Sequence, residues 1–562
     1  MANKLPQKIV IVGGVAGGMS AATRARRLCE TASITVLEKG PYVSYANCGI
    51  PYALGGVIDD DKSLLLNTPE SFKSRFNIDV HVNSEVVAID RIAKNVTVQK
   101  SDVREQVQHA YDKLILAQGA ASFRLPIPGA NLPCVFTLQT LDELKSIKEF
   151  IREHKSQRAV VIGGGFIGLE AAENLKHLGL EISIVEYAPH VLATIDAEMA
   201  EPIHAELRRQ NVQLLLNAKV ERIETTNYEG SVNVCTASGA KVPADIVLMA
   251  VGVRARSSLA GEAGLKLGKA GVSVNKYMQT SDPDIYAVGD MVETKHRIIG
   301  SPALLALAGP ANRQGRLAAD HIYGKKIAYR GNVGTSICKV FDMSIGSTGL
   351  SVEALRALGR SPEWVTVHTP NHASYYPGAN PITLRVVFDP ETGLLLGAQG
   401  LGKKHVDKRI DVLSTAIQAE MTICDLEHLE LAYAPPYGSA KDPVNMAGFV
   451  GSNLLRGDVR IAHPEELYGM DQAKIEIVDV RSPSEFAAGH LVGAVNMPID
   501  SLRESALALG KSKQVLVYCF VGYRGYLGYR ILAQLGFDAL NLDGGFKSVV
   551  EGGHTGLLAS IK

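Results

Sequence analysis

Cys48 is the first of two cysteines whose surroundings could support sulfur chemistry. It lies in YVSYANCGIPYALGG (42–56), where Gly49 and Pro51 predict a turn into the start of a helix. Backbone amides at a helix start favour a thiolate, the nucleophilic form of cysteine. Because a lone thiol cannot form an internal disulfide, the reaction must pass through a mixed disulfide, a sulfenate or a persulfide on one sulfur.

Cys519 is the second such cysteine, in VYCFVGYRGY (517–526). It ends a strand-like run, and the loop from Cys519 to Arg524 can curl so that its amides face the sulfur. Such a nest of amides, together with a guanidinium, stabilises a thiolate or a bound persulfide. The other five of the seven cysteines are scattered without CxxC spacing and are expected to fill space. This usage disfavours a disulfide framework or a metal site and predicts a cytoplasmic location.

A full G-x-G-x-x-G turn, formed by Gly163, Gly165 and Gly168, stands between a strand-like run and a helical pattern. Glycine lets the backbone approach a pyrophosphate, which then sits at the positive end of the helix. Glu186 follows 18 residues after Gly168, where a carboxylate can bond a ribose 2′-OH and repels a 2′-phosphate. The turn therefore predicts NADH rather than NADPH.

A second, less regular turn lies near the N-terminus, with Val15 where the middle glycine would stand. Its glycines are Gly13, Gly14, Gly17 and Gly18. Glu38 follows 20 residues after Gly18, with Lys39 beside it. Two such turns in order, each in a strand–turn–helix context with a terminal acid, predict two βαβ units and at least one bound dinucleotide.

Three apolar strands end in a small residue and a glycine. They are LILAQG (114–119), VLMAVG (247–252) and TSDPDIYAVGD (280–290), whose glycines are Gly119, Gly252 and Gly289. Asp290 then stands at a strand terminus next to a helix. These features favour a flavin in the first site, although Asp290 alone could also be a helix N-cap.

The chain that carries these motifs has 562 residues, which is too long for one core. Its 58 basic and 58 acidic residues balance, which argues against nucleic-acid and membrane-surface binding. The N-terminus lacks signal-peptide features, and no apolar run is long enough for a membrane span.

The pattern of elements predicts an α/β protein with several domains. TLRVVFDPETGLLLGAQGLG (383–402) predicts two strands joined at a turn, and a helical pattern follows from about 405 to 420. Strand-like runs restart at 475–480 and 514–519. The expected domains are a FAD-binding domain (1–120 and 253–330), a NAD-binding domain (121–252), an α+β domain (331–450), a linker (451–464) and a C-terminal α/β domain (465–562).

The order of these elements over residues 8–450 resembles the FAD-dependent pyridine nucleotide–disulfide oxidoreductases. The resemblance implies two Rossmann-like domains, with FAD on the first unit and NAD on the second. It also implies that Asp290 bonds the flavin ribityl chain. The α+β domain (331–450) is then a dimerisation domain, which completes the active site of the partner subunit in a homodimer. The motif S-x-x-x-C-G-x-P-Y around Cys48 resembles the single-cysteine branch, which contains coenzyme A-disulfide reductases, NADH oxidases and NADH peroxidases.

Two segments look most like the coenzyme A-disulfide reductases, in which the cysteine forms a mixed disulfide with CoA. They are GGVAGGMSAATRARR and YAPPYGSAKDPVN (433–445). The resemblance assigns the assisting tyrosine to Tyr433, with Tyr437 as the alternative and Tyr375 or Tyr376 as weaker candidates. CoA phosphates need cations, and among Arg24, Arg26 and Arg27 the resemblance favours Arg27. Ser44, Asn47 and Arg313 match family positions near CoA.

The C-terminal segment, with DVRSPSEFAAGHLVGAVNMP (479–498) and the Cys519 loop, resembles rhodanese domains. The six-residue span from Cys519 to Arg524 fits sulfur transfer, whereas related phosphatases use a longer loop. Asp479 and Arg481 are expected to hold the fold.

The resulting hypothesis is that NADH and FAD deliver electrons to Cys48, which reduces the sulfur–sulfur bond of CoA persulfide, polysulfide or CoA disulfide, while Cys519 holds sulfane sulfur. Two alternatives stay open. One is an NADH oxidase that cycles Cys48 through sulfenate. The other is a rhodanese-based sulfur carrier or redox sensor.

Overall fold

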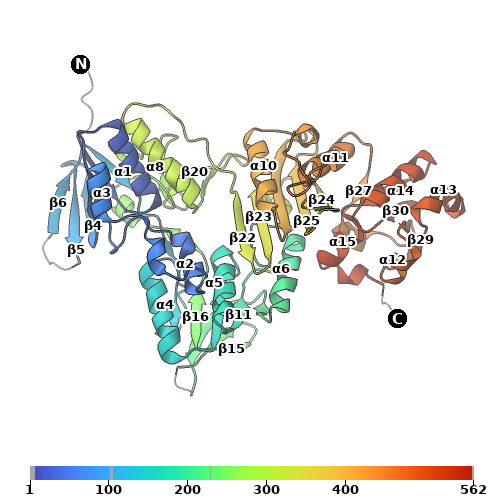
Figure 1. Ribbon diagram of the computed structural model, residues 1–562, viewed down its shortest axis with the longest axis horizontal. Helices are drawn as coiled ribbons and strands as arrows, with labels where there is room; N and C mark the ends of the chain where they lie inside the picture. The colour runs from blue at the N-terminus through green and yellow to red at the C-terminus, as the bar shows by residue number, and fades with distance from the viewer. Residues whose placement is uncertain (1–6, 102–105, 228–229, 560–562) are drawn as a thin grey trace. The chain divides into compact units, whose positions relative to one another are not determined.

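The computed structural model describes residues 7–101, 106–227 and 230–559. The N-terminal residues 1–6, part of the segment judged to lack signal-peptide features, lie outside these ranges. The chain divides into two compact units (Figure 1). Unit 1 is formed by the described residues of 1–187 and 218–332, and unit 2 by those of 188–217 and 333–562. Unit 2 thus includes segment 188–217, which the sequence assigned to the NAD-binding domain.

The first sheet of unit 1 is parallel, with strand order β19-β7-β1-β2-β3. Its strands are β1 (Lys8–Val12), β2 (Ser33–Leu37), β3 (Asp79–His81), β7 (Lys113–Leu116) and β19 (Ile285–Ala287). Helix α1 (Ala16–Leu28) joins β1 to β2, so the first predicted βαβ unit is confirmed. Ile9 and Ile11 of β1 are buried in the core, as expected for a parallel sheet covered on its faces.

The second sheet of unit 1 repeats this arrangement, with parallel neighbours β11-β10-β16-β9. These strands are β9 (Val135–Phe136), β10 (Arg158–Ile162), β11 (Glu181–Val185) and β16 (Ile246–Met249). Helix α5 (Phe166–His177) joins β10 to β11, which confirms the second βαβ unit. Both glycine turns therefore stand where a parallel strand passes into a helix.

Shorter elements complete unit 1. Its smaller sheets are β4 (Ser84–Asp90), β5 (Asn95–Lys100) and β6 (Gln106–Ala110); β13 (Val220–Thr225), β14 (Val232–Thr236) and β15 (Lys241–Ala244); β8 (Ala120–Ser122) with β17 (Val253–Ala255); and β18 (Val272–Ser273), β20 (Val292–Lys295) and β21 (Pro302–Leu304). The remaining helices are α2 (Ile50–Leu54), α3 (Pro69–Phe76), α4 (Leu141–His154), α7 (Ser258–Glu262) and α8 (Ala308–Ile322).

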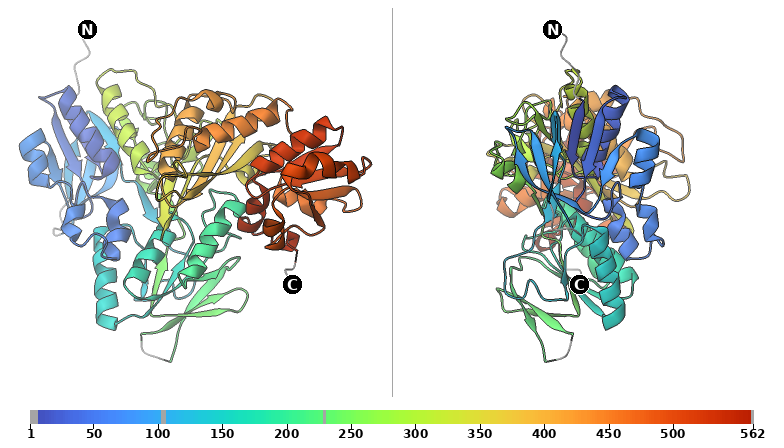
Figure 2. Two further views of the ribbon diagram at one scale, coloured as in Figure 1. Left: turned by 45° about the vertical axis from the view of Figure 1, so that its right-hand side comes forward. Right: turned by 90° about the vertical axis from the view of Figure 1, so that its left-hand side faces the viewer.

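Helices α1 and α8 lie side by side, blue and yellow-green in Figures 1 and 2. Their contact is close because Gly315 has no side chain: a Cβ there would stand 2.1 Å from the carbonyl oxygen of Gly17. Arg24 of α1 adds a 2.6 Å ion pair with Asp320 of α8. Helix α8 thereby supports the helix that begins at the first glycine turn.

Unit 2 contains an antiparallel sheet of order β22-β23-β26-β25-β24. Its strands are β22 (Ser336–Val340), β23 (Met343–Gly349), β24 (Glu363–Pro370), β25 (Pro381–Phe388) and β26 (Leu395–Gly402). Helix α10 (Val406–Gln418) packs on β23 and β26, and α11 (Pro443–Leu455) packs on β24 and β25 (Figure 1). The two strands and the helix predicted between residues 383 and 420 are confirmed. Helix α6 (Ala197–Arg209), β12 (Gln213–Leu215) and α9 (Val352–Ala357) belong to the same unit.

The structure differs from the sequence expectation at the linker. Residues 451–455 form the last turn of α11 rather than a linker. Gly451 lies within the helix because of packing: a Cβ there would stand 2.3 Å from a carbon of the Ile423 side chain. Glycine here serves close contact, not flexibility, and Ser452 is also buried.

The C-terminal part of unit 2 holds a parallel sheet of order β27-β31-β30-β28-β29. Its strands are β27 (Ile461–Ala462), β28 (Ile475–Asp479), β29 (Ala494–Asn496), β30 (Gln514–Tyr518) and β31 (Ala539–Leu542). The helices around it are α12 (Pro483–Ala487), α13 (Leu502–Ser505), α14 (Tyr523–Gln534) and α15 (Gly545–Glu551). Parallel strands with intervening helices in both units confirm the α/β class.

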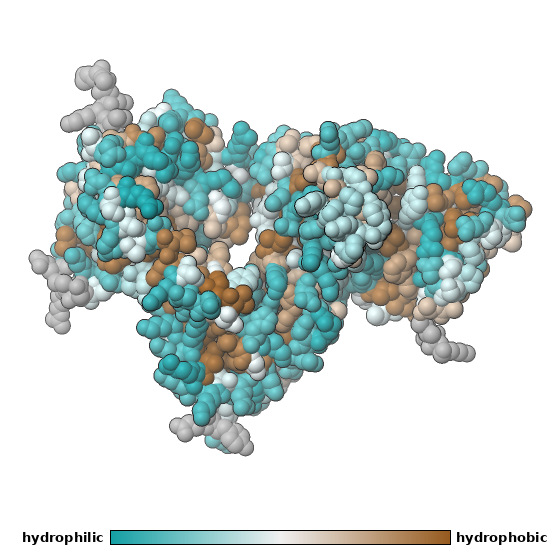
Figure 3. Space-filling model, viewed as in Figure 1, coloured by the Kyte–Doolittle hydropathy of each residue, from teal (hydrophilic) through white to brown (hydrophobic). Residues whose placement is uncertain are grey.

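The face shown in Figure 3 is mostly hydrophilic, with a group of hydrophobic residues over α2 and α5 of unit 1. Ile167 of α5 and Val57, just after α2, are among the exposed hydrophobic residues.

Within the described residues, no helix is both long and apolar enough to cross a membrane.

Candidate functional site

The first glycine turn is shaped by close backbone contacts. Gly13 has φ +108°, and a Cβ there would stand 2.2 Å from the carbonyl oxygen of Ala117. A Cβ on Gly18 would stand 1.9 Å from the carbonyl oxygen of Gly13. Helix α1 can begin directly over the end of β1 only because both side chains are absent. The amide of Gly14 donates to Glu38 Oε2 at 2.7 Å, so the acid predicted to meet a ribose lies beside the turn.

The second turn has the same geometry. Gly163 has φ +106°, and a Cβ on Gly168 would stand 2.0 Å from the carbonyl oxygen of Gly163. Gly165 differs, because among the described residues, its chain neighbours apart, no atom lies within 4 Å of the place where its Cβ would be. The protein's own packing therefore does not require glycine at 165, whereas close approach of a pyrophosphate does. Glu186 accepts a 2.5 Å hydrogen bond from the amide of Gly164.

Asp290 carries a buried oxygen that needs a hydrogen-bond donor. Among the described residues none donates to its Oδ1. Desolvation raises the pKa of this carboxyl group. The neighbouring Gly289 has φ +80°, and its amide donates to Gln314 Oε1 at 2.7 Å. A buried unpartnered acceptor at a strand end fits a sugar or ribityl hydroxyl, so the residues present suit a flavin.

The remaining predicted cofactor residues have simpler surroundings. Gly119 and Gly252 have φ of +66° and +98°, and in the described part of the chain no atom beyond their neighbours would approach a Cβ at either position within 4 Å. Lys39 is exposed and forms a 2.7 Å ion pair with Glu85. That pair lies at the surface, where such contacts contribute little.

Cys48 lies in a single 3₁₀ turn (Asn47–Gly49) immediately before α2. Its side chain is exposed, and the thiol donates weakly to Asn47 Oδ1 at 3.8 Å. The protein around it still removes part of its hydration, and this desolvation raises the pKa of the thiol. The charges of Glu170 and Asp290 act in the same direction. Desolvation and these two carboxylates therefore act against the thiolate that the predicted helix start favours.

Glu170 was not foreseen from the sequence. It projects from α5, where its Oε1 accepts a 3.0 Å hydrogen bond from the hydroxyl of Tyr52 in α2. Desolvation raises the pKa of its carboxyl group. The contact links residues 118 positions apart, and only the place of Glu170 two residues after Gly168 could have drawn attention to it.

The residues proposed to meet CoA fall into two groups. Ser44 and Asn47 share the segment of Cys48, and Ser44 has φ +49°, a left-handed conformation that is unusual for a residue other than glycine. Arg27 and Arg313 are exposed on α1 and α8, the two helices that pack side by side.

The neighbouring arginines have other roles. Arg24 is paired with Asp320. Arg26 is buried, and its guanidinium donates to several backbone carbonyls, including those of Phe76 and Ala32. Of the three arginines on α1, only Arg27 is exposed.

In unit 2, Tyr433 lies beside Tyr375. Their hydroxyl oxygens are 3.1 Å apart, and both side chains are exposed. The hydrogen bond between the two hydroxyls raises the pKa of Tyr375. The structure thus joins the favoured tyrosine to one of the weaker candidates, while Tyr437 and Tyr376 are exposed outside this pair.

Cys519 directly follows β30, and its side chain is buried. The amide of Gly522 donates to Cys519 Sγ at 3.2 Å, which is one contact of the kind expected in a nest of amides. The guanidinium of Arg524 forms two hydrogen bonds with Glu485 of α12, at 2.8 and 2.6 Å. That guanidinium lowers the pKa of Glu485 to about 2. Glu485 is a second residue that the sequence reasoning missed.

Asp479 and Arg481 form a buried pair with an N–O distance of 2.7 Å. Arg481 also donates to the carbonyl oxygen of Gly489 at 2.6 Å. These bonds stay within the domain, in agreement with a role in the fold. In the described part of the chain, no group of three or more His, Cys, Asp or Glu could hold a metal ion.

Comparison with known proteins shows which family has this arrangement of domains. The pattern of the pyridine nucleotide-disulphide oxidoreductases matches residues 7–315, more than half of the chain. The chain belongs to this family. The dimerisation domain of the same family matches residues 335–442, and a rhodanese-like domain matches residues 463–551. This pyridine nucleotide-disulphide oxidoreductase therefore uses FAD and NAD(H), and it carries a rhodanese-like domain at its C-terminus.

Three relatives are similar over most of the oxidoreductase. The coenzyme A disulfide reductase of Staphylococcus haemolyticus (strain JCSC1435) is 37% identical over 450 residues, covering 80% of this chain and 100% of that protein. The structure of reduced Bacillus anthracis CoADR-RHD is 42% identical with a TM-score of 0.96, covering 99% and 100%. The NAD-dependent persulfide reductase from A. fulgidus is 38% identical with a TM-score of 0.90, covering 96% and 99%.

Proposed function

We propose that this oxidoreductase uses NADH to reduce sulfur–sulfur bonds of CoA persulfide, polysulfide or CoA disulfide at Cys48, with Cys519 as the carrier of sulfane sulfur. Its relatives support both halves of the proposal, since one is named a coenzyme A disulfide reductase and another a persulfide reductase. The observation that carries the persulfide half is the Cys519 loop, whose Gly522 amide is directed at the sulfur. Reduction of CoA disulfide alone requires no such loop.

The cofactors have defined places in this proposal. The first turn and Asp290 would hold FAD, the second turn and Glu186 would hold NADH, and the bound cofactors would supply two electrons. Cys48 attacks the CoA sulfur, forming a mixed disulfide while the original sulfur–sulfur bond breaks. The leaving group is hydrosulfide from the persulfide or CoA thiolate from the disulfide. Two-electron reduction of the mixed disulfide returns the thiols of Cys48 and CoA.

Proton supply is assigned to a tyrosine. In the homodimer that the dimerisation domain indicates, Tyr433 of the partner subunit protonates the leaving sulfur. Its hydrogen bond with Tyr375 supports this role, because the second hydroxyl orients the first. Arg27, Arg313, Ser44 and Asn47 are proposed to hold CoA. A cytoplasmic location also stays a prediction; it is consistent with seven described cysteines that form no disulfide.

Anaerobic NADH oxidation tests the proposal directly. Purified enzyme is given CoA persulfide, CoA disulfide or inorganic polysulfide in parallel, and sulfide release is followed. Rapid turnover with sulfide from the persulfide supports a persulfide reductase, and turnover with the disulfide alone restricts the function to that substrate. NADH oxidation that begins only when oxygen is admitted would replace the proposal with the oxidase alternative.

A further inference from the structure

The Cys519 loop is held from behind by helix α15. The amide of Phe546 donates to the carbonyl oxygen of Cys519 at 2.8 Å, and the amide of Lys547 donates to that of Phe520 at 2.9 Å. Gly545 precedes these residues with φ +67°, and a Cβ there would stand 2.5 Å from the oxygen of Cys519. A displacement of α15 would therefore displace the backbone of the Cys519 loop.

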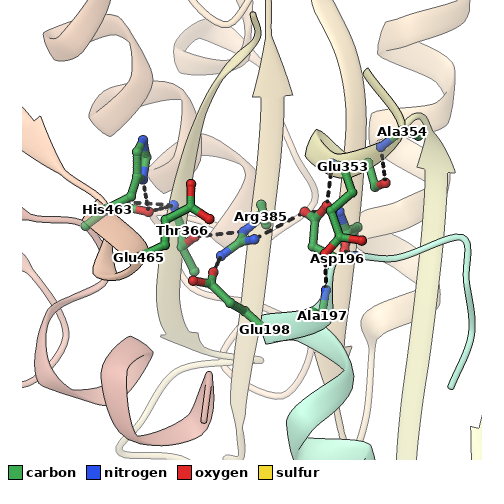
Figure 4. Close-up of polar contacts among 12 residues, drawn as sticks. Asp196, Ala197, Glu198, Glu353, Ala354, Thr366, Arg385, His463 and Glu465 are labelled. Carbon is green, nitrogen blue, oxygen red and sulfur yellow. Dashed lines mark hydrogen bonds and ion pairs between the residues drawn. The ribbon is translucent and has the colours of Figure 1, made fainter. Parts of the chain in front are cut away.

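Helix α15 is in turn anchored to the dimerisation sheet at its beginning. Asp543, just before the helix, is buried and accepts from the amide of Thr366 at 3.0 and 3.1 Å. Thr366 belongs to β24, and Figure 4 shows it near His463. The Nδ1 atom of His463 lies 3.5 Å from Asp543 Oδ2, within the range of an ion pair.

A second anchor reaches the middle of the helix. His368 is buried on β24, with Nδ1 2.9 Å from Thr383 Oγ1 and Nε2 2.9 Å from Ser548 Oγ of α15. Burial, followed by the nearby cations, lowers the pKa of His368 to about 3, so the ring is neutral and can donate on one side and accept on the other. Strand β24 therefore contacts this segment twice, through the backbone amide of Thr366 and the side chain of His368.

A third anchor follows the end of α15. His554 Nε2 lies 2.7 Å from Glu198 Oε1 of α6. Glu198 is also bonded by Arg385 of β25, which reaches Asp196 as well (Figure 4). Three separate contacts outside the rhodanese-like domain therefore fix the helix that fixes the Cys519 loop.

We propose that His368 is a positioning residue for sulfur transfer, so that strand β24 of the dimerisation domain completes the sulfurtransferase site around Cys519. The inference rests on the proposed role of Cys519. When the bond from His368 to Ser548 is lost, α15 shifts, and the loop that it carries no longer directs the Gly522 amide at the sulfur. The thiolate then loses stabilisation, whereas Cys48 chemistry in unit 1 is unaffected.

The test uses full-length holoenzyme with three substitutions. His368→Leu removes both hydrogen bonds at similar volume, Ser548→Ala removes only the α15 partner, and His368→Gln restores a polar group. Thr348→Val is the matched control, because Thr348 is buried in the same sheet and loses a comparable 2.9 Å contact to Thr335. Flavin content and NADH-dependent reduction of CoA disulfide report intact folding in every variant.

Two readouts follow Cys519 itself. The pH midpoint of its alkylation by iodoacetamide, measured by peptide mass spectrometry, should rise by about half a unit or more in H368L and S548A, as expected for one lost hydrogen bond. Sulfur transfer from thiosulfate to cyanide should fall about threefold to tenfold, with partial recovery in H368Q. Reduction of CoA disulfide should stay within about twofold of the wild type.

The outcomes separate this inference from the function on which it rests. An unchanged alkylation midpoint in both H368L and S548A would overturn the positioning role, as would an equal shift in the Thr348→Val control. If wild-type enzyme transferred no sulfur, the carrier role of Cys519 would fail, yet the alkylation midpoint would still decide whether β24 positions the thiol.

Discussion

The protonation of His463 should change the stability of unit 2, and the fluorescence of a single tryptophan can report that change. The ring is buried between two carboxylates, with Nε2 3.0 Å from Glu363 Oε1 and Nδ1 3.5 Å from Asp543 Oδ2. Burial opposes its charge, but the hydrogen bonds and charges of Asp543 and Glu363 outweigh burial and raise the pKa of His463 to about 9. The ring stacks on Trp364, the single tryptophan of the chain, at a centroid distance of 3.6 Å.

The sign and size of the effect follow from linkage. A histidine whose pKa is raised on folding stabilises the folded state fully below its unfolded value of about 6.5. That contribution is lost as the pH rises through about 9. The difference between the two pKa values corresponds to about 3 kcal/mol. We therefore expect the free energy of unfolding of unit 2 to fall by about this amount between pH 6.5 and pH 9.5, beyond any change from other groups.

Guanidinium unfolding followed by Trp364 fluorescence at a series of pH values measures this change. His463→Gln removes the titrating group, so the difference between wild type and variant isolates the histidine. A wild-type curve that runs parallel to the variant's across this pH range would refute the argument, because it would show that His463 has the same pKa in both states.

Three further predictions concern the catalytic groups and the buried network. Cys48→Ser should abolish NADH-dependent turnover with flavin content unchanged, whereas Cys29→Ser, measured in the same assay, should retain it. Glu485→Gln should raise kcat/KM for thiosulfate about threefold, because the carboxylate that neutralises Arg524 also repels this dianion. An equal rise for a neutral sulfur donor would contradict the charge argument. Arg385→Met should destabilise unit 2 by about 3–5 kcal/mol in guanidinium unfolding, since Asp196 and Glu198 would lose their buried cation. A loss of stability below about 1 kcal/mol would mean that the carboxylates find other partners.

The sequence was most informative where one local pattern fixes one local structure. A strand that ends in Gly13 or Gly163 can pass directly into a helix, so both βαβ units and the acids at Glu38 and Glu186 were predictable. The turn between residues 388 and 395 was equally clear, because Asp389 accepts hydrogen bonds from the backbone that follows it. Such signals lie within a few residues of the feature that they predict.

Other features depend on residues far apart in the chain. Arg24, Arg26 and Arg27 were all considered for the CoA phosphates, but Arg24 is paired with Asp320 and Arg26 with backbone carbonyls, which only packing reveals. Gly451 suggested a linker and instead permits close contact with Ile423. Glu170 and Glu485 were missed because their partners lie 118 and 39 positions away, so neither spacing carries a recognisable motif.

The contact between α15 and β24 has a consequence for building chimaeras. Asp543 accepts from the amide of Thr366, and Ser548 is hydrogen-bonded to His368, so two polar groups of the rhodanese-like domain lose a partner when this dimerisation sheet is removed. A graft of residues 463–551 alone onto another scaffold would expose or orphan those groups. The transferable module is the sulfur-carrying domain together with the sheet edge that receives it, and the two surfaces are expected to change jointly in evolution.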